Sequence, residues 1–440
     1  MNSKARRLLQ LGLAMGATTL LAPPVRSLRR ALRVRDTEKR VARFATRVER
    51  QFDRAKDFLG DRFGQDPPPE IITYRGYGTA DRVYLKGRVL EAQGFTPSAL
   101  TDSRWRNLRN TLKHFETDEI PGARLRARFQ GDEQEVVTDE EGYFEVWLQP
   151  TTPLPTDRLW HEIEVELLSP LVEGGGPAHT AGYVLVPPPS TRFGIISDID
   201  DTIVHTNATS LLKMARTVFL GNPHTRLPFE GVAAFYEALQ AGARGTEFNP
   251  LFYVSSSPWN FYDLINEFLE VQDIPVGPLM LRDWGLSNEE VLPNRHAPHK
   301  VKSIRQILDT FPDLPFILIG DSGQEDPEIY SRIVRETPSR IFATYIRNVN
   351  PDPARAQAIV TLASEVLEAG STLILVDDTL AAAKHAAEQG WISPDALPRV
   401  EAKTAEDQGQ PSDEAPSVEV TTPIVIEGDA TSSQPGSTRP

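Results

Sequence analysis

Two aspartates separated by a single residue follow an apolar run near the middle of the chain. Residues 193–196 are apolar, and Ser197-Asp198-Ile199-Asp200-Asp201-Thr202 comes directly after them. Side chains at positions i and i+2 of an extended segment project to the same side, so Asp198 and Asp200 can face one pocket. Two carboxylates at close range repel each other unless a proton or a cation compensates their charge. Because Mg²⁺ prefers carboxylate, water and phosphate oxygens, this spacing favours a magnesium site.

Polar residues are also associated with two further apolar runs. Ser255 begins a serine triplet after one run, and Gly320-Asp321 ends another, with Lys300 lying upstream of it. A hydroxyl group can hold a phosphate oxygen, and a lysine can neutralise phosphate charge. Taken singly, each feature has an ordinary explanation: a helix cap, a turn, or a solvated surface lysine at Lys300 or its neighbour Lys302. The ordered set Asp-x-Asp-x-Thr, Ser, Lys and Gly-Asp-x-x-x-x-Asp is what indicates phosphate chemistry.

The elements that must position these residues alternate between short apolar runs and helical stretches. Such runs occur at 193–196, 251–254, 316–319, 341–346 and 373–376. Continuous apolar strands alternating with helices are typical of a parallel sheet covered on both faces, and therefore of the α/β class. Such sheets bind ligands at the carboxyl ends of their strands, where the aspartates and serines stand. The sequence therefore places all of these polar residues at one edge of one sheet.

The three motifs resemble those of the haloacid dehalogenase superfamily. The segments 197–203, 253–259 and 319–330 are more specifically similar to the phosphatidate phosphatases of the actin-patch-protein type, which are remotely related to lipins. The resemblance covers about 185–350, with weaker similarity at 74–78. It implies a haloacid-dehalogenase-like, Rossmann-like domain with a parallel sheet.

The resemblance also implies roles for individual residues. Asp198 would attack phosphorus, and Asp200 would protonate the leaving oxygen and then activate water. Ser255 and Lys300 would hold the phosphoryl group, although Lys302 could take the place of Lys300 because only the helical register decides between them. A carboxylate nucleophile divides hydrolysis into two displacements through an aspartyl phosphate.

The same resemblance implies Mg²⁺ as the cofactor. The metal would lie between Asp198, the backbone carbonyl of Asp200 and Asp321, with Asp326 in support. The expected activity is magnesium-dependent hydrolysis of phosphatidate to diacylglycerol and phosphate. The alternatives are a phosphatase for another phosphomonoester, such as a phosphoprotein or a sugar phosphate, and a non-catalytic lipid-binding module.

Residues close to the motifs bear on the choice of substrate. The segment 206–228 leaves room only for a small flap over the site, and an open site suits a headgroup presented by a membrane. Trp259, Phe261 and Tyr262, just past the serines, are apolar and could either belong to the core or touch lipid. The sequence does not identify the lipid or the oligomeric state.

The remaining segments divide the chain further. Residues 71–187 read as short strands and predict a small β-sandwich of immunoglobulin-like or transthyretin-like type, without a catalytic cluster. Within it, 136–138 and 143–147 predict a hairpin with Gly142 near its turn. A Pro187-Pro188-Pro189 boundary separates this domain from a catalytic domain at 190–400.

Composition and the two ends of the chain set further limits. The net charge of −14 argues against a dedicated nucleic-acid binder, and the absence of cysteine excludes disulfides, thiolate catalysis and cysteine–zinc sites. Residues 1–66 are basic, and the apolar stripe at 41–59 predicts an amphipathic helix that could either lie on a membrane surface or pack against the protein's own domains. The apolar stretch 8–23 is too short to cross a bilayer. It follows two arginines as in an export signal, but Pro23 and Pro24 make a poor cleavage site, so we expect a cytoplasmic, peripherally attached protein rather than an exported one. The acidic segment 401–440 predicts a disordered tail.

Overall fold

The computed structural model describes residues 68–91, 119–170, 178–200, 202–203, 229–282, 296–349 and 352–409. Contacts divide the chain into Met1–Asp66 and Pro67–Pro440, and the first of these lies outside the described residues. The predictions for the amphipathic helix and for the flap also fall outside them. Among the described residues, no helix combines the length and the apolar character that a membrane span requires.

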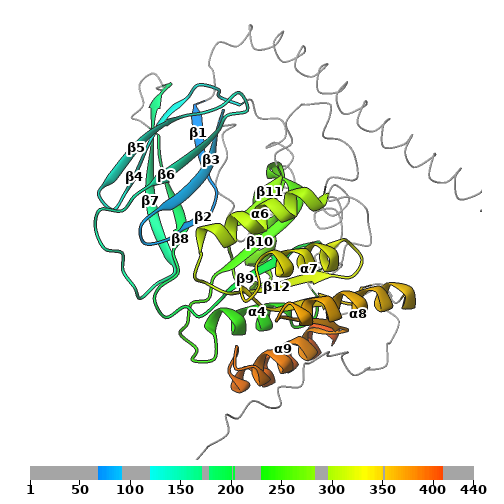
Figure 1. Ribbon diagram of the computed structural model, residues 1–440. Coiled ribbons are helices and arrows are strands. Elements are labelled where there is room, and N and C mark those ends of the chain that lie inside the picture. The colour runs from blue at the N-terminus through cyan, green and yellow to red at the C-terminus, as the bar shows by residue number, and fades with distance from the viewer. Residues whose placement is uncertain are drawn as a thin grey trace, which may run out of the picture. The chain divides into compact units, whose positions relative to one another are not determined.

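A six-stranded sheet forms the centre of the C-terminal part of the chain (Figure 1). Its order is β11-β10-β9-β12-β13-β14, and every neighbouring pair is parallel. The strands are β9 (Gly194–Asp198), β10 (Leu251–Pro258), β11 (Leu279–Arg282), β12 (Phe316–Asp321), β13 (Ile341–Arg347) and β14 (Thr372–Val376). All five predicted apolar runs are strands of this sheet, which confirms the parallel α/β prediction. The chain leaves β9 for β10 and β11 on one side and returns to β12 on the other, so the carboxyl end of β9 lies at a switch point where ligands bind in such sheets.

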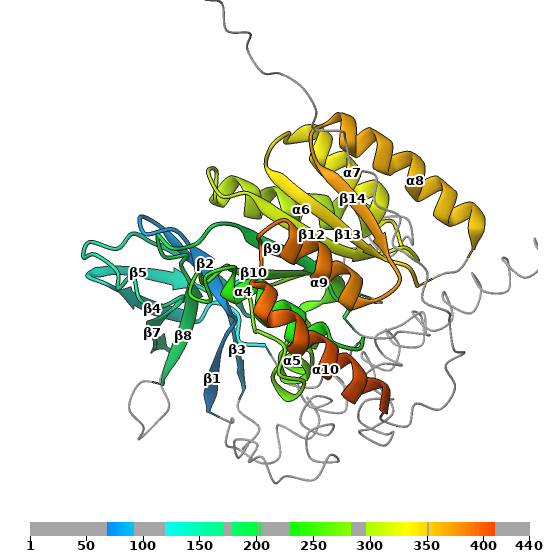
Figure 2. The same cartoon turned by 90° about the horizontal axis from the view of Figure 1, so that it is seen from below.

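Helices cover both faces of this sheet (Figure 2). They are α4 (Val232–Ala241), α5 (Tyr262–Val271), α6 (His296–Thr310), α7 (Asp326–Glu336), α8 (Pro353–Glu368), α9 (Thr379–Glu388) and α10 (Leu397–Gly409), with short 3₁₀ turns at Trp259–Phe261 and Pro394–Ala396. Ile195 packs in the core with α4, α5, α9 and α10, whereas its neighbour Ile196 packs in the core with α6, α7 and α8. Successive strand residues therefore serve opposite cores, which explains why the strands are continuously apolar.

Helix α10 corrects the predicted start of the acidic tail. We expected disorder from residue 401, but the helix continues to Gly409. Val400 is buried, and the Asp407 carboxylate accepts a hydrogen bond from the backbone N–H of Gly231. The overall acidity of 401–440 concealed this short packed face, because composition averaged over forty residues carries no information on the spacing of individual contacts.

The N-terminal described part forms one hydrogen-bonded sheet of eight strands. The strands are β1 (Pro69–Thr73), β2 (Gly76–Gly78), β3 (Val83–Glu91), β4 (Arg124–Phe129), β5 (Asp132–Val137), β6 (Tyr143–Leu148), β7 (Trp160–Ser169) and β8 (His179–Leu185). The pairs are antiparallel except for β2 with β8. The assignment to an immunoglobulin-like or transthyretin-like sandwich stays a prediction.

The hairpin predicted between 136–138 and 143–147 is wrong. Strand β5 pairs with β4 across a turn at Gln130 and Gly131, whereas β6 pairs with β3. Both turn residues have positive φ, 45° and 83°, as the tightest hairpin turns require. The glycine at 142, which also has positive φ, belongs to a loop in which the Asp139 carboxylate accepts hydrogen bonds from backbone N–H groups. Gly142 therefore lies in a turn between β5 and β6, although these two strands do not pair with each other.

Candidate active site

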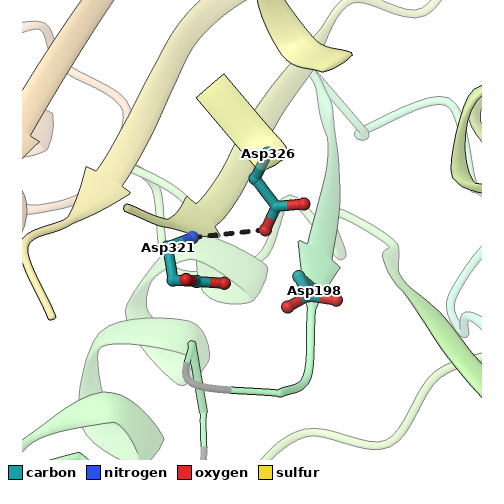
Figure 3. Close-up of side chains that lie close together, drawn as sticks. All are labelled: Asp198, Asp321 and Asp326. Carbon is teal, nitrogen blue, oxygen red and sulfur yellow. Dashed lines mark hydrogen bonds between the residues drawn. The ribbon is translucent and has the colours of Figure 1, made fainter. Parts of the chain in front are cut away.

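Three carboxylates meet at the carboxyl edge of the parallel sheet (Figure 3). Asp198 ends β9, Asp321 ends the neighbouring strand β12, and Asp326 begins α7. Each of them contributes an oxygen atom to a group whose members all lie within 4.8 Å of one another. All three side chains are buried, with exposed fractions of 1% or less. Adjacent parallel strands bring Asp198 and Asp321 together, because the edge at which both strands end is the same.

The hydrogen bonds of Asp321 and Asp326 leave one oxygen atom free. Asp321 Oδ1 accepts from the backbone N–H groups of Gly323 and Gln324, at 2.6 and 2.9 Å. Asp326 Oδ2 accepts from the Asp321 backbone N–H at 3.3 Å. Asp321 Oδ2 is buried without a hydrogen-bond partner among the described residues. A buried carboxylate oxygen is rarely left in this state, so the geometry fits a cation ligand.

Lys300 of α6 is the counter-charge to this group. Its Nζ lies 2.8 Å from Asp198 Oδ1 and 2.6 Å from Asp326 Oδ1, and the side chain is almost fully buried. Burial by itself lowers the pKa of the Lys300 ammonium, but the two carboxylates raise the pKa above its ordinary value, so the group stays charged. Lys302 is exposed. The structure thus brings Lys300, and not Lys302, to Asp198.

Among the described residues, the charges of the site do not balance. Three carboxylates against one ammonium leave two negative charges when all groups are ionised. Burial raises the pKa of the Asp198 carboxyl well above its ordinary value, with Lys300 opposing the rise and the neighbouring carboxylates adding to it. Burial and the charge of Asp326 raise the pKa of Asp321 to about 7. These shifts indicate a site that either takes up protons or holds a cation, and a divalent ion with oxygen ligands fits the donor set.

Asp200 and the serines form a second polar group next to the carboxylates. Ser255 Oγ donates to Asp200 Oδ2 at 3.1 Å and lies 2.6 Å from Ser257 Oγ. The backbone carbonyl of Asp200 accepts from Gln324 Nε2 at 3.2 Å. The Asp200 side chain is therefore directed to Ser255 and is not one of the three clustered carboxylates. Its carbonyl as a metal ligand stays a prediction.

Known proteins are similar to the part of the chain that contains these residues. Residues 193–348 match the family model described as the catalytic domain of phosphatidate phosphatase APP1. The chain is 31% identical over 221 residues to phosphatidate phosphatase APP1 of Saccharomyces cerevisiae, an alignment that covers 48% of this chain and 36% of the yeast protein. Residues 193–348 are thus similar to an APP1-type catalytic domain. The matched stretch contains Asp198, Asp200, Ser255, Lys300, Asp321 and Asp326.

The curated relatives are matched over only part of their length. An uncharacterized protein of Schizosaccharomyces pombe is 28% identical over 163 residues, which cover 36% of this chain and 26% of that protein. The chain therefore spans about a third or less of the relatives that it matches. A solved structure of a Porphyromonas gingivalis protein of unknown function is 11% identical, covers 31% of this chain and 61% of its own, and reaches a TM-score of 0.15. That score is too low to support any conclusion about the fold.

Several residues of the matched stretch 193–348 for which the sequence predicted no role support the site. Tyr236 OH of α4 lies 2.7 Å from Ser197 Oγ, which in turn donates to the Asp198 backbone carbonyl at 2.6 Å. A Cβ at Gly320 would stand 2.6 Å from Asp326 Oδ2, so glycine is required for the close approach of Asp326. Gln324 lies inside the motif at 319–330, but the sequence did not predict a role for it. Tyr236 carries no local signal, because it reaches the site through helix packing.

The aromatic residues after the serines have a definite location. Phe261 and Tyr262 are buried in the core, as one of the two readings predicted. Trp259 is half-buried and stacks on Tyr74 of the N-terminal part, with ring centroids 4.7 Å apart. Tyr262 OH accepts a hydrogen bond from the backbone N–H of Arg75 at 2.7 Å. These contacts attach the end of β10, which carries Ser255, to the eight-stranded sheet.

Proposed function

We propose that this protein is a magnesium-dependent phosphatidate phosphatase. It would hydrolyse phosphatidate to diacylglycerol and inorganic phosphate through an aspartyl phosphate at Asp198. The observation that carries the proposal is the buried Asp198 carboxylate at the end of β9, 2.8 Å from Lys300 Nζ and grouped with Asp321 and Asp326. The match of residues 193–348 to the APP1 catalytic domain supports the substrate. A haloacid-dehalogenase-like fold is part of the proposal and agrees with the strand order.

In the first displacement, a carboxylate oxygen of Asp198 forms a bond to phosphorus while the bond from phosphorus to the glycerol oxygen breaks. Asp200, in its protonated form, gives its proton to that oxygen, and diacylglycerol leaves. Ser255, which donates to Asp200 in this structure, lies where it can turn its hydroxyl to a phosphoryl oxygen. Lys300 keeps its charge and offsets the negative charge of the phosphoryl group.

In the second displacement, the Asp200 carboxylate takes a proton from water, and the water oxygen attacks phosphorus. The bond from phosphorus to Asp198 breaks, phosphate leaves, and Asp200 is protonated again. A bound Mg²⁺ would neutralise carboxylate and phosphoryl charge. Asp198 and Asp321, with Asp326 in support, are the side chains that would hold it, together with the Asp200 carbonyl. By compensating the buried charges, it would also keep Asp198 ionised, as a nucleophile must be.

A phosphate-release assay tests the proposal against its alternatives. Purified protein is given phosphatidate in mixed micelles, a soluble short-chain phosphatidate, glycerol 3-phosphate or a phosphopeptide, each with Mg²⁺ or with EDTA. Release from both phosphatidates that depends on Mg²⁺ supports the proposal. Release from soluble phosphomonoesters alone indicates a different phosphatase, and vesicle binding without release indicates a lipid-binding module.

We also propose that the protein works in the cytoplasm at a membrane surface and attaches through its basic N-terminal segment. The support is the excess of arginine in residues 1–66 together with the apolar stripe at 41–59. Each cation near an anionic surface contributes about 1 kcal/mol to binding. Deletion of residues 1–60 should abolish binding to anionic vesicles while hydrolysis of a soluble short-chain phosphatidate is kept. Loss of folding on deletion would instead give the segment a structural role.

A further inference from the structure

A cavity lies on the other side of α6 from Asp198. It has a volume of about 830 Å³. In an α-helix, residues two positions apart point in nearly opposite directions, because each residue turns by about 100°. Lys300 accordingly reaches Asp198, whereas Lys302 lines the cavity. None of the residues that line the cavity belongs to the candidate active site, so it is a separate feature of the molecule.

The cavity carries an excess of positive charge. Its lining includes four cationic side chains, Arg82, Lys302, Arg305 and Arg332, and one carboxylate, Asp309. Arg305 and Arg332 share a single partner, Glu336, each at 2.7 Å. Within the described part of the chain, four cations therefore face two carboxylates, in a protein whose net charge is −14. A concave basic surface on an acidic protein concentrates anions from solution.

The walls of the cavity are held in place by packing. The Arg82 guanidinium lies over the Trp147 ring, 4.0 Å from its centroid. Trp147 packs against Tyr84 at 5.0 Å, and Tyr84 packs against Tyr77 at 5.6 Å. Tyr77 OH in turn accepts a hydrogen bond from Gln306 of α6 at 2.8 Å. A guanidinium that covers an aromatic face still has its N–H groups for an oxyanion, and its fixed position reduces the entropy lost on binding.

We propose that this cavity binds an organic phosphate, with Arg82 and Lys302 as its principal ligands. The guanidinium of an arginine can donate two parallel hydrogen bonds to the oxygens of a phosphate, and Lys302 adds a compact positive charge. The volume lies in the range of sites for small organic molecules, and Trp147, Pro298 and Val301 provide apolar wall for the organic part. The phosphate could be a lipid headgroup or a soluble ester, and the two share the same recognition chemistry.

Direct binding measurements on the full chain test the proposal and distinguish the two sources. Glycerol 3-phosphate is titrated by calorimetry in EDTA, and flotation is measured with phosphatidylcholine vesicles with and without phosphatidylglycerol. The test variant is Arg82→Gln/Lys302→Gln, and both of these side chains are exposed. The matched control is Arg244→Gln/Lys384→Gln, which removes an exposed arginine and an exposed helical lysine at positions outside the cavity lining.

We expect the test variant to bind at least one of the two probes about tenfold more weakly than the wild type, because two charge-assisted contacts are lost. The control variant should bind as the wild type does, and all three proteins should hydrolyse a soluble substrate at the same rate. Loss in the calorimetric arm indicates a soluble ester, and loss in flotation alone indicates a headgroup. Equal binding by wild type and test variant, no binding by the wild type to either probe, or an equal loss in the control would overturn the proposal. The binding readout is independent of phosphatase activity, so failure of one proposal leaves the other intact.

Discussion

The charged residues of the two sheets differ in burial and in pairing. On the eight-stranded sheet, Arg126 and Arg128 of β4 stand between Glu133 and Glu135 of β5 on one side and Glu164 and Glu166 of β7 on the other, with ion pairs between 2.7 and 3.8 Å. These pairs join neighbouring strands and are mostly exposed. At the edge of the parallel sheet, three buried carboxylates share one lysine.

The difference separates a structural use of charge from a chemical one. Exposed pairs on a sheet contribute little to stability, because solvent screens them, but they keep the strand surface soluble and in register. Buried unbalanced carboxylates destabilise the fold, and a protein keeps them where a ligand or a cation offsets the cost. The number of charged residues is therefore a poor guide to the site, and the balance of buried charge is a better one.

The largest effect is expected at Asp198. Asp198→Asn keeps the size of the side chain and removes the attacking charge. We expect phosphate release to fall by roughly 10³ or more, since only binding and electrostatic stabilisation would remain. Phosphate release is measured with equal concentrations of wild type and variant, and circular dichroism checks that the variant keeps its fold. A rate above about a tenth of the wild type would contradict nucleophilic attack by Asp198.

Lys300 and Arg128 provide a direct comparison between the two kinds of charge. Lys300→Met leaves Asp198 and Asp326 without their ammonium partner, so in EDTA we expect a loss of roughly 2–4 kcal/mol in the free energy of unfolding. In the presence of Mg²⁺ we expect an activity loss of about 10². Arg128→Gln removes an exposed cation that pairs with Glu133, and we expect no change in either quantity. Urea unfolding and phosphate release measure both variants. Similar unfolding free energies for the two variants would contradict the claim that the buried lysine contributes more to stability than the exposed arginine.

Metal removal tests whether a cation compensates the carboxylates. EDTA should abolish turnover and Mg²⁺ should restore it, and Asp321→Ala should need more Mg²⁺ because a direct ligand is lost. Turnover that persists in EDTA, or an unchanged Mg²⁺ requirement in Asp321→Ala, would argue against this metal site.

The pKa of Asp321 adds a pH dependence to the metal effect. In the metal-free folded protein this pKa is raised to about 7, so the carboxyl holds a proton that the unfolded chain releases at lower pH. Its contribution to stability is present at low pH and is lost as the pH rises through about 7. Mg²⁺ must displace that proton, so it should raise the melting temperature more at about pH 8 than at about pH 6. If Mg²⁺ shifts the melting temperature equally at the two pH values in differential scanning fluorimetry, metal binding does not displace a proton from Asp321.

The smallest effect concerns the contact between the two sheets. Tyr74 stacks on Trp259, which follows the serines of β10. Tyr74→Ala should shift the Ser255 hydroxyl slightly and lower kcat by about tenfold or less, with KM changed much less. Tyr183→Ala, at an exposed tyrosine of β8, is the matched control and should behave as the wild type. If both variants lose activity equally, the N-terminal sheet acts through stability and not through the position of Ser255.

The sequence by itself determined the elements that depend on local pattern. The continuous apolar runs specified the parallel strands, because a strand buried on both faces has no polar side. Asp198 and Asp321 could be placed at one edge because every strand of a parallel sheet ends on the same side. The ordered motifs contain Asp198, Ser255 and Asp321, whereas Tyr236 reaches the site through helix packing and carries no local signal.

Only the tertiary structure decided the features that depend on how distant segments pack. The choice of Lys300 over Lys302 follows from the rotation of α6 about its axis, which is set by burial of Val301, Ile304 and Ile307 against the sheet. Strand β6 pairs with β3 and not with its sequence neighbour β5, which pairs with β4 across the turn at Gln130 and Gly131. The basic cavity combines residues more than 200 positions apart. Local spacing fixes the direction of a side chain within its own element, but the partner that the side chain meets is fixed by the burial of apolar faces across the whole molecule.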